Sequence, residues 1–96
     1  MSTLSDQFTA RINDALAQCY ALGYTPHRFE QILRTYGAVG AARRLVVSSE
    51  IHDGLKSLKD LGRLDLSVEH IILDPVFASL FTKSEKEAAA WRLTQV

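Results

Sequence analysis

The chain has 96 residues, of which 47% are hydrophobic, and its 11 basic and 11 acidic side chains give a formal net charge of zero. This length suits one compact domain, residues 1–96, and the high apolar share with few prolines and glycines excludes a disordered chain. The balanced charge disfavours a general affinity for nucleic acid, and no apolar run approaches the roughly 20 residues of a membrane span.

Cys19 is the only cysteine, and it bears on both the compartment and the chemistry. A single thiol cannot form a disulfide within the chain, which fits a reducing compartment. Because the N-terminus also lacks a basic segment followed by an apolar one, we expect a soluble, cytoplasmic protein. Cys19 lies at helical spacing from Phe8, Ile12 and Leu16, so we interpret it as a small core residue rather than a nucleophile.

Apolar residues at intervals of three and four predict a first helix over residues 3–22. Gly23 follows the last of them and is expected to end this helix in a left-handed conformation. The positions that share the apolar face are Leu4, Phe8, Ile12, Ala15, Leu16 and Cys19.

Thr25 and Pro26 predict the start of a second helix, with Thr25 as its cap and Pro26 as its first residue. Its apolar positions follow the helical template and are Phe29, Ile32, Leu33 and Tyr36. Gly37 is expected to stop this helix, and a short third helix should follow over residues 38–47.

A fourth helix is expected to open at Ser48 or Ser49 and to end at Gly62. Gly62 should adopt a left-handed conformation there. The link over residues 62–66 is rich in leucine, so we interpret it as structural and not catalytic.

Three further starts are marked by capping residues in the last third of the chain. Ser67 should cap a fifth helix, which Pro75 keeps short because a proline disfavours helical geometry at the residue before it. Asp74 with Pro75 should open a sixth, and Thr82 with Glu85 forms a capping box for a last helix. No segment alternates with period two. The sequence therefore predicts an all-α fold, a single compact domain of six to seven short helices in an irregular bundle.

Between residues 22 and 94 five segments form a set with specific spacing: Gly23-Tyr24-x-Pro26-x-x-Phe29, Gly37-x-Val39-x-Ala41-Ala42-Arg43-Arg44-Leu45, Gly54-Leu55, Leu61-Gly62-Arg63-Leu64-Asp65-Leu66-Ser67-Val68-Glu69 and Leu80-Phe81-Thr82-x-x-Glu85. In this set the chain resembles a family of short, mostly uncharacterised bacterial helical domains, which occur alone or at the C-terminus of larger proteins. The resemblance implies an all-helical fold and brings no activity or catalytic residue with it.

Candidates for catalysis or metal binding are few. The histidines, His27, His52 and His70, form no H-x-x-x-H pair and have no cysteine at ligand spacing, so we interpret them as surface or half-buried residues. No G-x-G-x-x-G, G-x-x-x-x-G-K-[ST] or G-x-S-x-G motif is present. We therefore predict no enzymatic activity, no cofactor and no metal site, with catalysis at an oligomeric interface as the alternative.

Four arginines form the most prominent polar feature: Arg28, Arg34, Arg43 and Arg44. One interpretation is a solvated face whose arginines pair with the acidic side chains of residues 50–74. The other is a surface that binds a protein or a nucleic acid. A helix-turn-helix around Gly37 is disfavoured, because residues 38–42 offer almost no side chain that could contact a base.

Trp91 lies in the last predicted helix beside three alanines, which leave it few local partners. We expect its indole to pack against Phe77, Leu80 or Phe81, as a lone tryptophan in a small domain commonly does. The alternative is an exposed indole that faces a partner.

The function that the sequence predicts is a small non-enzymatic protein–protein interaction or regulatory module of bacterial or phage origin. Its partner would be another protein or a second copy of the chain. The alternative is a weak nucleic-acid-binding or accessory regulatory domain that acts beside a larger enzyme. The candidate partner-binding residues are Arg28, Arg34, Arg43, Arg44 and Trp91.

Overall fold

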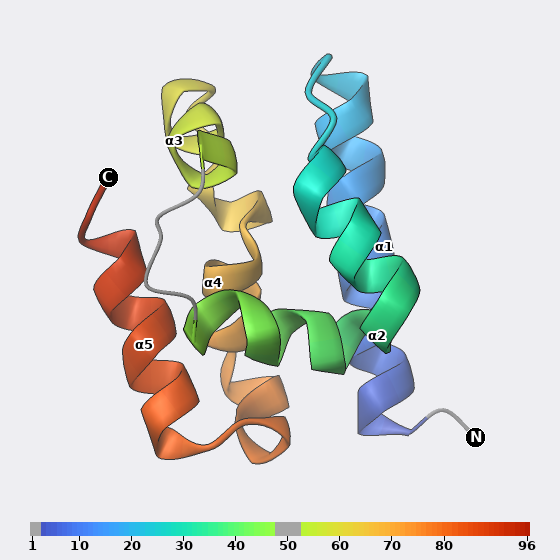
Figure 1. Ribbon diagram of the computed structural model, residues 1–96, viewed down its shortest axis with the longest axis vertical. Coiled ribbons are helices and arrows are strands. Elements are labelled where there is room, and N and C mark those ends of the chain that lie inside the picture. Colours follow the sequence, from blue (N-terminus) through green and yellow to red (C-terminus); the bar gives the residue numbers. More distant parts are fainter. Residues whose placement is uncertain (1–2, 48–52) are drawn as a thin grey trace.

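The computed structural model describes residues 3–47 and 53–96, which form helices and turns with no strand among them (Figure 1). The elements in chain order are α1 (Leu4–Ala21), α2 (His27–Val47), α3 (Asp53–Asp60), η1 (Leu64–Leu66), α4 (Val68–Ile72), η2 (Pro75–Leu80) and α5 (Lys83–Leu93). The predicted all-α fold is confirmed. Across the described ranges no helix combines the length and apolar character needed to cross a bilayer.

Helix α1 begins and ends as local interactions require. The backbone N–H of Asp6 donates to Thr3 Oγ1 at 3.0 Å, and the N–H of Thr3 donates to Asp6 Oδ2 at 3.2 Å, which completes a capping box. At the other end Gly23 has φ +80°, as predicted. The N–H of Tyr24 then reaches back to the carbonyl of Cys19 at 3.0 Å, the backbone bond of a Schellman motif.

Gly37 divides α2 into two arms. It has φ +74° and ψ 176°, a backbone conformation outside the helical region, and Figure 1 shows the sharp bend that results. The two helices expected on either side of Gly37 are thus these two arms. The first arm begins at His27, one residue later than expected. The carbonyl of Pro26 accepts a hydrogen bond from the backbone N–H of Glu30 at 3.0 Å.

The end of α3 is a second Schellman motif. Gly62 has φ +71°, as predicted, and the N–H of Arg63 donates to the carbonyl of Leu58 at 2.8 Å. Arg63 also donates to Gln18 Oε1 on α1 at 2.9 Å, so the link that follows α3 is fixed to the first helix. The expected helix start at Ser48 or Ser49 lies outside the described residues.

The three remaining caps form as predicted. Ser67 Oγ accepts the N–H of His70 at 3.1 Å, and Asp74 Oδ1 accepts the N–H of Val76 at 3.0 Å. Thr82 and Glu85 form the capping box of α5. The predicted sixth helix is the 3₁₀ segment η2 rather than an α-helix.

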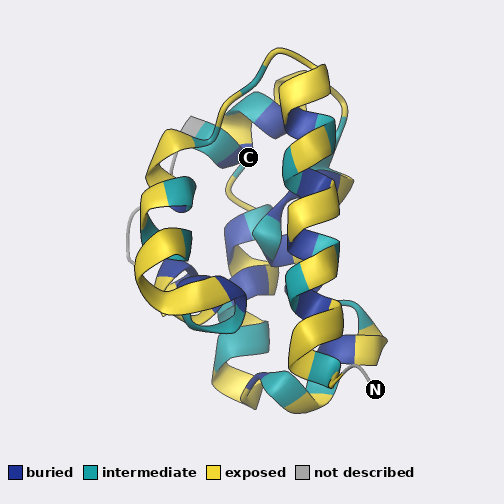
Figure 2. Ribbon diagram, turned by 90° about the vertical axis from the view of Figure 1, so that its right-hand side faces the viewer, coloured by how far each residue is buried: buried dark blue, intermediate teal, exposed yellow. Residues whose placement is uncertain are grey.

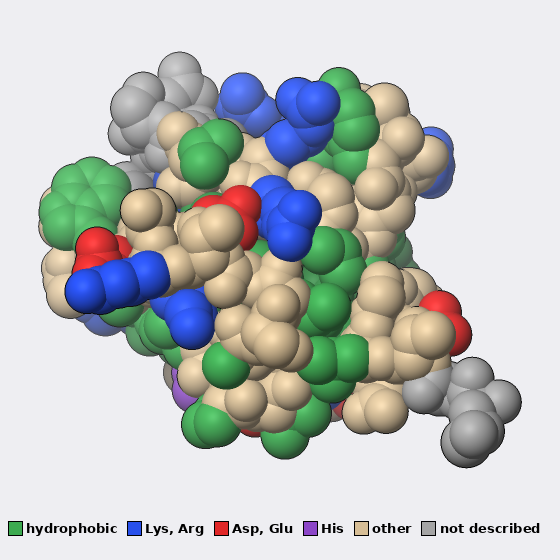
Figure 3. Space-filling model, turned by 90° about the horizontal axis from the view of Figure 1, so that it is seen from below, with side chains coloured by type: hydrophobic (Ala, Val, Ile, Leu, Met, Phe, Trp, Pro, Cys, Tyr) green, Lys and Arg blue, Asp and Glu red, His purple; other side chains and the backbone are tan. Residues whose placement is uncertain are grey.

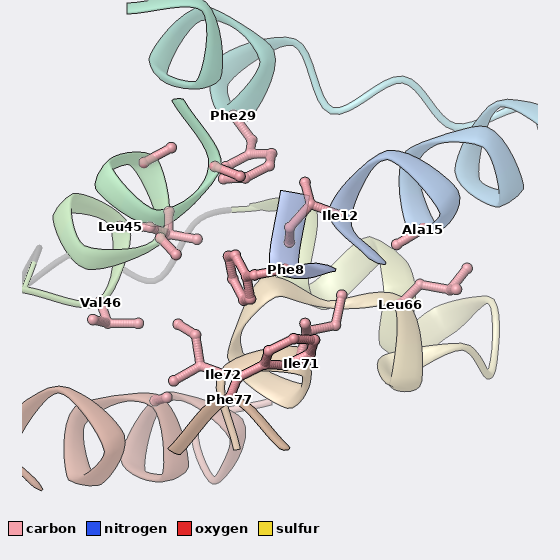
Figure 4. Packing of buried hydrophobic residues seen from close by; sticks show 14 of the residues in the cluster. Phe8, Ile12, Ala15, Phe29, Leu45, Val46, Leu66, Ile71, Ile72 and Phe77 are labelled. Carbon is pink, nitrogen blue, oxygen red and sulfur yellow. The ribbon is translucent and has the colours of Figure 1, made fainter. Parts of the chain in front are cut away.

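The core lies where the buried faces of the helices meet, and Figure 2 shows these faces turned inward. Phe8 stands at its centre with 0% exposure. The ring of Phe8 packs edge-on against Phe77 at 5.1 Å between centroids (Figure 4). It packs in the same way against Phe81 at 5.2 Å. Such edge-to-face pairs stabilise a core beyond the area that they bury.

Candidate functional site

A pocket of about 120 Å³ opens between α1, the segment that leads into α2, α3 and α4. Most of its wall is apolar because α1 presents a continuous apolar face to it and α3 adds two leucines. The apolar side chains on these two helices are Ile12, Ala15, Leu16, Cys19, Leu55 and Leu58. Since these helices are distant in sequence, the pocket exists only in the folded chain.

Two buried charged residues, Glu69 of α4 and Arg92 of α5, also line the pocket. Their exposures are 3% and 1%. Burial raises the pKa of the Glu69 carboxyl, and the positive charge of Arg92 offsets part of this effect. Charged side chains are rarely buried unless an opposite charge compensates them. Glu69 and Arg92 therefore form a buried polar region in a mostly apolar site.

Sequence reasoning missed both of these residues, because a charged side chain is ordinarily expected at the surface. Ala89 is completely buried, and a residue three positions further along a helix lies on the same face. Helical phase therefore directs Arg92 inward and Trp91 away from the core. Hydrophobicity alone predicts the reverse.

The exposed residues of the pocket mark where it meets solvent. His27 and Arg28, in the first turn of α2, line the pocket and are both exposed. Arg28 is thus the one predicted partner-binding arginine that lines the pocket.

Cys19 is buried, as predicted, and it also lines the pocket. Burial raises the pKa of its thiol, and the nearby charge of Arg63 offsets part of this rise. The thiol is therefore kept in its protonated, weakly nucleophilic form at neutral pH.

The structure holds the other three arginines in separate contacts. Arg34 pairs with Glu30 at 3.9 Å, and Arg44 stacks over the ring of Tyr36 at 3.7 Å from its centroid. Arg43 donates to the carbonyl of Leu80 at 2.6 Å and lies 3.7 Å from Glu85.

For two of the four arginines, these contacts differ from the expected pairing with residues 50–74. The acidic partners of Arg34 and Arg43 are Glu30 and Glu85, which lie outside residues 50–74. Seen from below, the surface has basic side chains scattered among acidic and apolar ones (Figure 3).

Trp91 does not pack into the core as expected. Its side chain is 51% exposed, because the buried face of α5 is formed by Ala89 and Arg92. Phe77 and Phe81, two of the three expected partners of the indole, pack against Phe8 instead. The exposed indole is the alternative that the sequence left open.

The histidines give no metal site within the described chain. His27 and His70 are exposed, in agreement with their interpretation as surface residues, whereas His52 lies outside the described residues. In residues 3–47 and 53–96 no three histidine, cysteine or acidic side chains are grouped as metal binding would require.

Comparison of the chain with protein-family models, with curated proteins and with solved structures found no match. The resemblance to short bacterial helical domains therefore stays a prediction, and we infer function from the geometry of this chain.

Proposed function

We propose that the chain is a small non-enzymatic module that binds another protein through the outer face of α5. The observation that carries this proposal is the 51% exposed indole of Trp91 on a helix whose opposite face is buried. Tryptophan is enriched among the residues that dominate binding energy at interfaces.

The surroundings of Trp91 on α5 also support this proposal. Lys83, Glu87 and Trp91 are spaced four residues apart and lie along one stripe of the helix. Lys83 and Glu87 pair at 3.9 Å with side chains 90% and 66% exposed. An aromatic anchor next to exposed, oppositely charged side chains is the usual composition of a binding site with a polar rim.

Nucleic-acid binding is the weaker alternative, because Arg34 and Arg43 are already paired with acidic side chains. We expect no measurable affinity for duplex DNA at physiological salt. Sub-micromolar binding in a gel shift at roughly 150 mM salt would reverse the order of the two functions. A cytoplasmic site of action belongs to the proposal, since Cys19 is a free buried thiol.

Site-specific photo-crosslinking in the source cells tests the proposal. A photoreactive residue at Ala90, which is exposed beside Trp91, should capture a defined protein, and the same residue at exposed Ser79 on η2 is the control. The captured protein should then bind the purified chain, and Trp91→Ala should weaken that binding by roughly tenfold or more.

A matched variant makes the test specific to α5. Val76 is 58% exposed on η2, so Val76→Ala removes an exposed apolar group, smaller than the indole, from another surface and should leave the affinity within about twofold. Equal losses in Trp91→Ala and Val76→Ala would refute the assignment of the binding surface to α5. Capture of a second copy of the chain would identify self-association as the interaction.

A further inference from the structure

We propose that the pocket between α1, α3 and α4 is a binding site for a small, neutral, ring-sized organic molecule that carries one hydrogen-bonding group. This inference goes beyond the proposed function and depends on different residues. Trp91 and the outer face of α5 play no part in it.

The size and lining of the pocket set the size of the ligand. Its volume of about 120 Å³ is close to that of apolar protein cavities that take up benzene, which measure about 150 Å³. Ile12, Leu55 and Leu58 provide wall surfaces that would contact the faces of a ring. A drug-sized molecule or a nucleotide would not fit, because such ligands occupy pockets of roughly 300 Å³ or more.

The buried charges decide the charge of the ligand. Glu69 and Arg92 bring one negative and one positive group to the pocket, so they balance each other. A charged ligand would lose its hydration without meeting a net opposite charge, which is unfavourable. A neutral ligand avoids that cost, and its hydroxyl or amide can still exchange a hydrogen bond with either group.

The opening of the pocket lies where its lining residues are exposed to solvent. On α2 these residues are His27 and Arg28. We assign no reaction to them, so the site is proposed for binding alone.

Phenol is the probe for the wild-type chain. Its binding is monitored through the chemical shifts of the backbone amides in an NMR titration. We expect saturable shifts centred on Ala15, Cys19 and Ser67, which line the pocket, with millimolar to high-micromolar affinity as befits so small a ligand. Toluene, benzoate and benzylammonium should each bind several-fold more weakly, since the first lacks the hydroxyl and the others carry a charge. Shifts that do not saturate, or that are spread evenly over the chain, would refute the site.

A pair of substitutions on α1 separates the pocket from the rest of the helix. Ala15→Leu fills the pocket from its wall, whereas Ala17→Leu makes the same change at an exposed position. We expect Ala15→Leu to abolish phenol binding and Ala17→Leu to retain the wild-type affinity. Equal effects of the two variants would overturn the proposal. If Ala15→Leu unfolds the chain, the relative affinities of the four probes for the wild type test the proposal instead.

Glu69→Gln tests the role of the buried charges. It removes one of the two balanced charges and leaves the positive charge of Arg92 in excess. Benzoate should then bind more tightly than phenol, a reversal of the wild-type order, and an unchanged order would refute the role of the charges. N-acetyl-tyrosinamide carries the same phenol ring on a peptide unit. Tighter binding of that compound than of phenol would refute the limit of one ring on the size of the ligand.

The outcomes of the pocket experiments and those of the α5 experiments are independent of each other. Trp91→Ala should bind phenol as the wild type does, and Ala15→Leu should retain the protein partner. Failure of the pocket proposal therefore leaves the proposed function standing, and the reverse holds equally.

Discussion

Helix α1 contributes to two ends of the core that differ in how they are filled. Near the start of the helix, Phe8 packs against the rings of Phe77 and Phe81 at 5.1 and 5.2 Å between centroids. Two and three turns further along the same face, Ala15 and Cys19 border a pocket of about 120 Å³. The same helical face thus supports a closed end and an open end.

The difference lies in the residues that the rest of the chain supplies. The closed end receives aromatic rings from η2 and the residue after it, whereas the open end receives Glu69 and Arg92. Protein interiors are normally close-packed, and two charges in them are less stabilising than well-packed apolar groups. We infer that the closed end supplies most of the stability and that the open end is retained for binding.

Substitution at the closed end should have the largest effect. Phe8→Ala should lower the free energy of unfolding by about 3–5 kcal/mol, because it removes a fully buried ring and leaves a cavity. Leu16→Ala, at the half-buried wall of the pocket, should cost roughly half as much. Urea unfolding of the two variants measures both values, and equal losses would contradict the distinction between the two ends.

At the open end, loss of Arg92 should be the most damaging change. Arg92→Met conserves much of the side-chain volume but leaves Glu69 buried without the positive charge that compensates it. We expect a loss of about 3 kcal/mol at neutral pH, measured by urea unfolding. The double variant Arg92→Met with Glu69→Gln should recover part of that loss, and a further loss in the double variant would show that the two charges do not compensate each other.

The pH dependence of stability should identify Glu69 as the titrating group. Its pKa is raised in the folded chain by burial, so the folded chain holds this proton more tightly than the unfolded chain does. The contribution of Glu69 to stability is therefore complete below the ordinary carboxyl pKa of about 4.3 and is lost as the pH rises through the folded pKa. The unfolding free energy of the wild type minus that of Glu69→Gln should therefore decrease as the pH rises over that range. An increase with pH would mean that the pKa is lowered instead.

Local chemistry made the boundaries of the helices predictable. Thr82 with Glu85 and the glycine at Gly62 act through backbone hydrogen bonds within a few residues, so their roles follow from short motifs. Trp91 and Arg92 were not predictable from hydrophobicity, because the phase of α5 buries the arginine and exposes the larger apolar ring. A polar residue in the core is a common exception to sequence patterns at sites that bind a ligand.

The pocket itself could not be predicted from the sequence. Ile12 and Leu55 both satisfy the apolar pattern of their helices, and that pattern does not distinguish a close-packed contact from one that leaves space. Free volume depends on how α1, α3 and α4 are placed relative to one another, which is a property of the tertiary fold.

Gly62 should show a smaller effect that comes only from the backbone. Its φ is +71°, and an added Cβ would meet no atom within 4 Å beyond those of the adjoining residues. Gly62→Ala should therefore cost about 1 kcal/mol from the left-handed conformation alone. Asparagine tolerates this conformation better, so Gly62→Asn should cost less. Thermal melts measure both, and an alanine variant that melts with the wild type would contradict the assigned helix end.

Trp91→Ala should have the smallest effect on stability, within about 0.5 kcal/mol, although tryptophan is the largest side chain in the protein. The reason is that the indole is 51% exposed and that Ala89 and Arg92 form the buried face of its helix. Because Trp91 is the only tryptophan, the fluorescence of the native chain should also be red-shifted, as for an indole in contact with water. A blue-shifted emission together with a loss of roughly 3–5 kcal/mol would place Trp91 in the core and remove the basis for assigning the protein-binding surface to α5. The opposite pair of results would leave a large apolar side chain on the surface that contributes little to folding, as a residue kept for binding should.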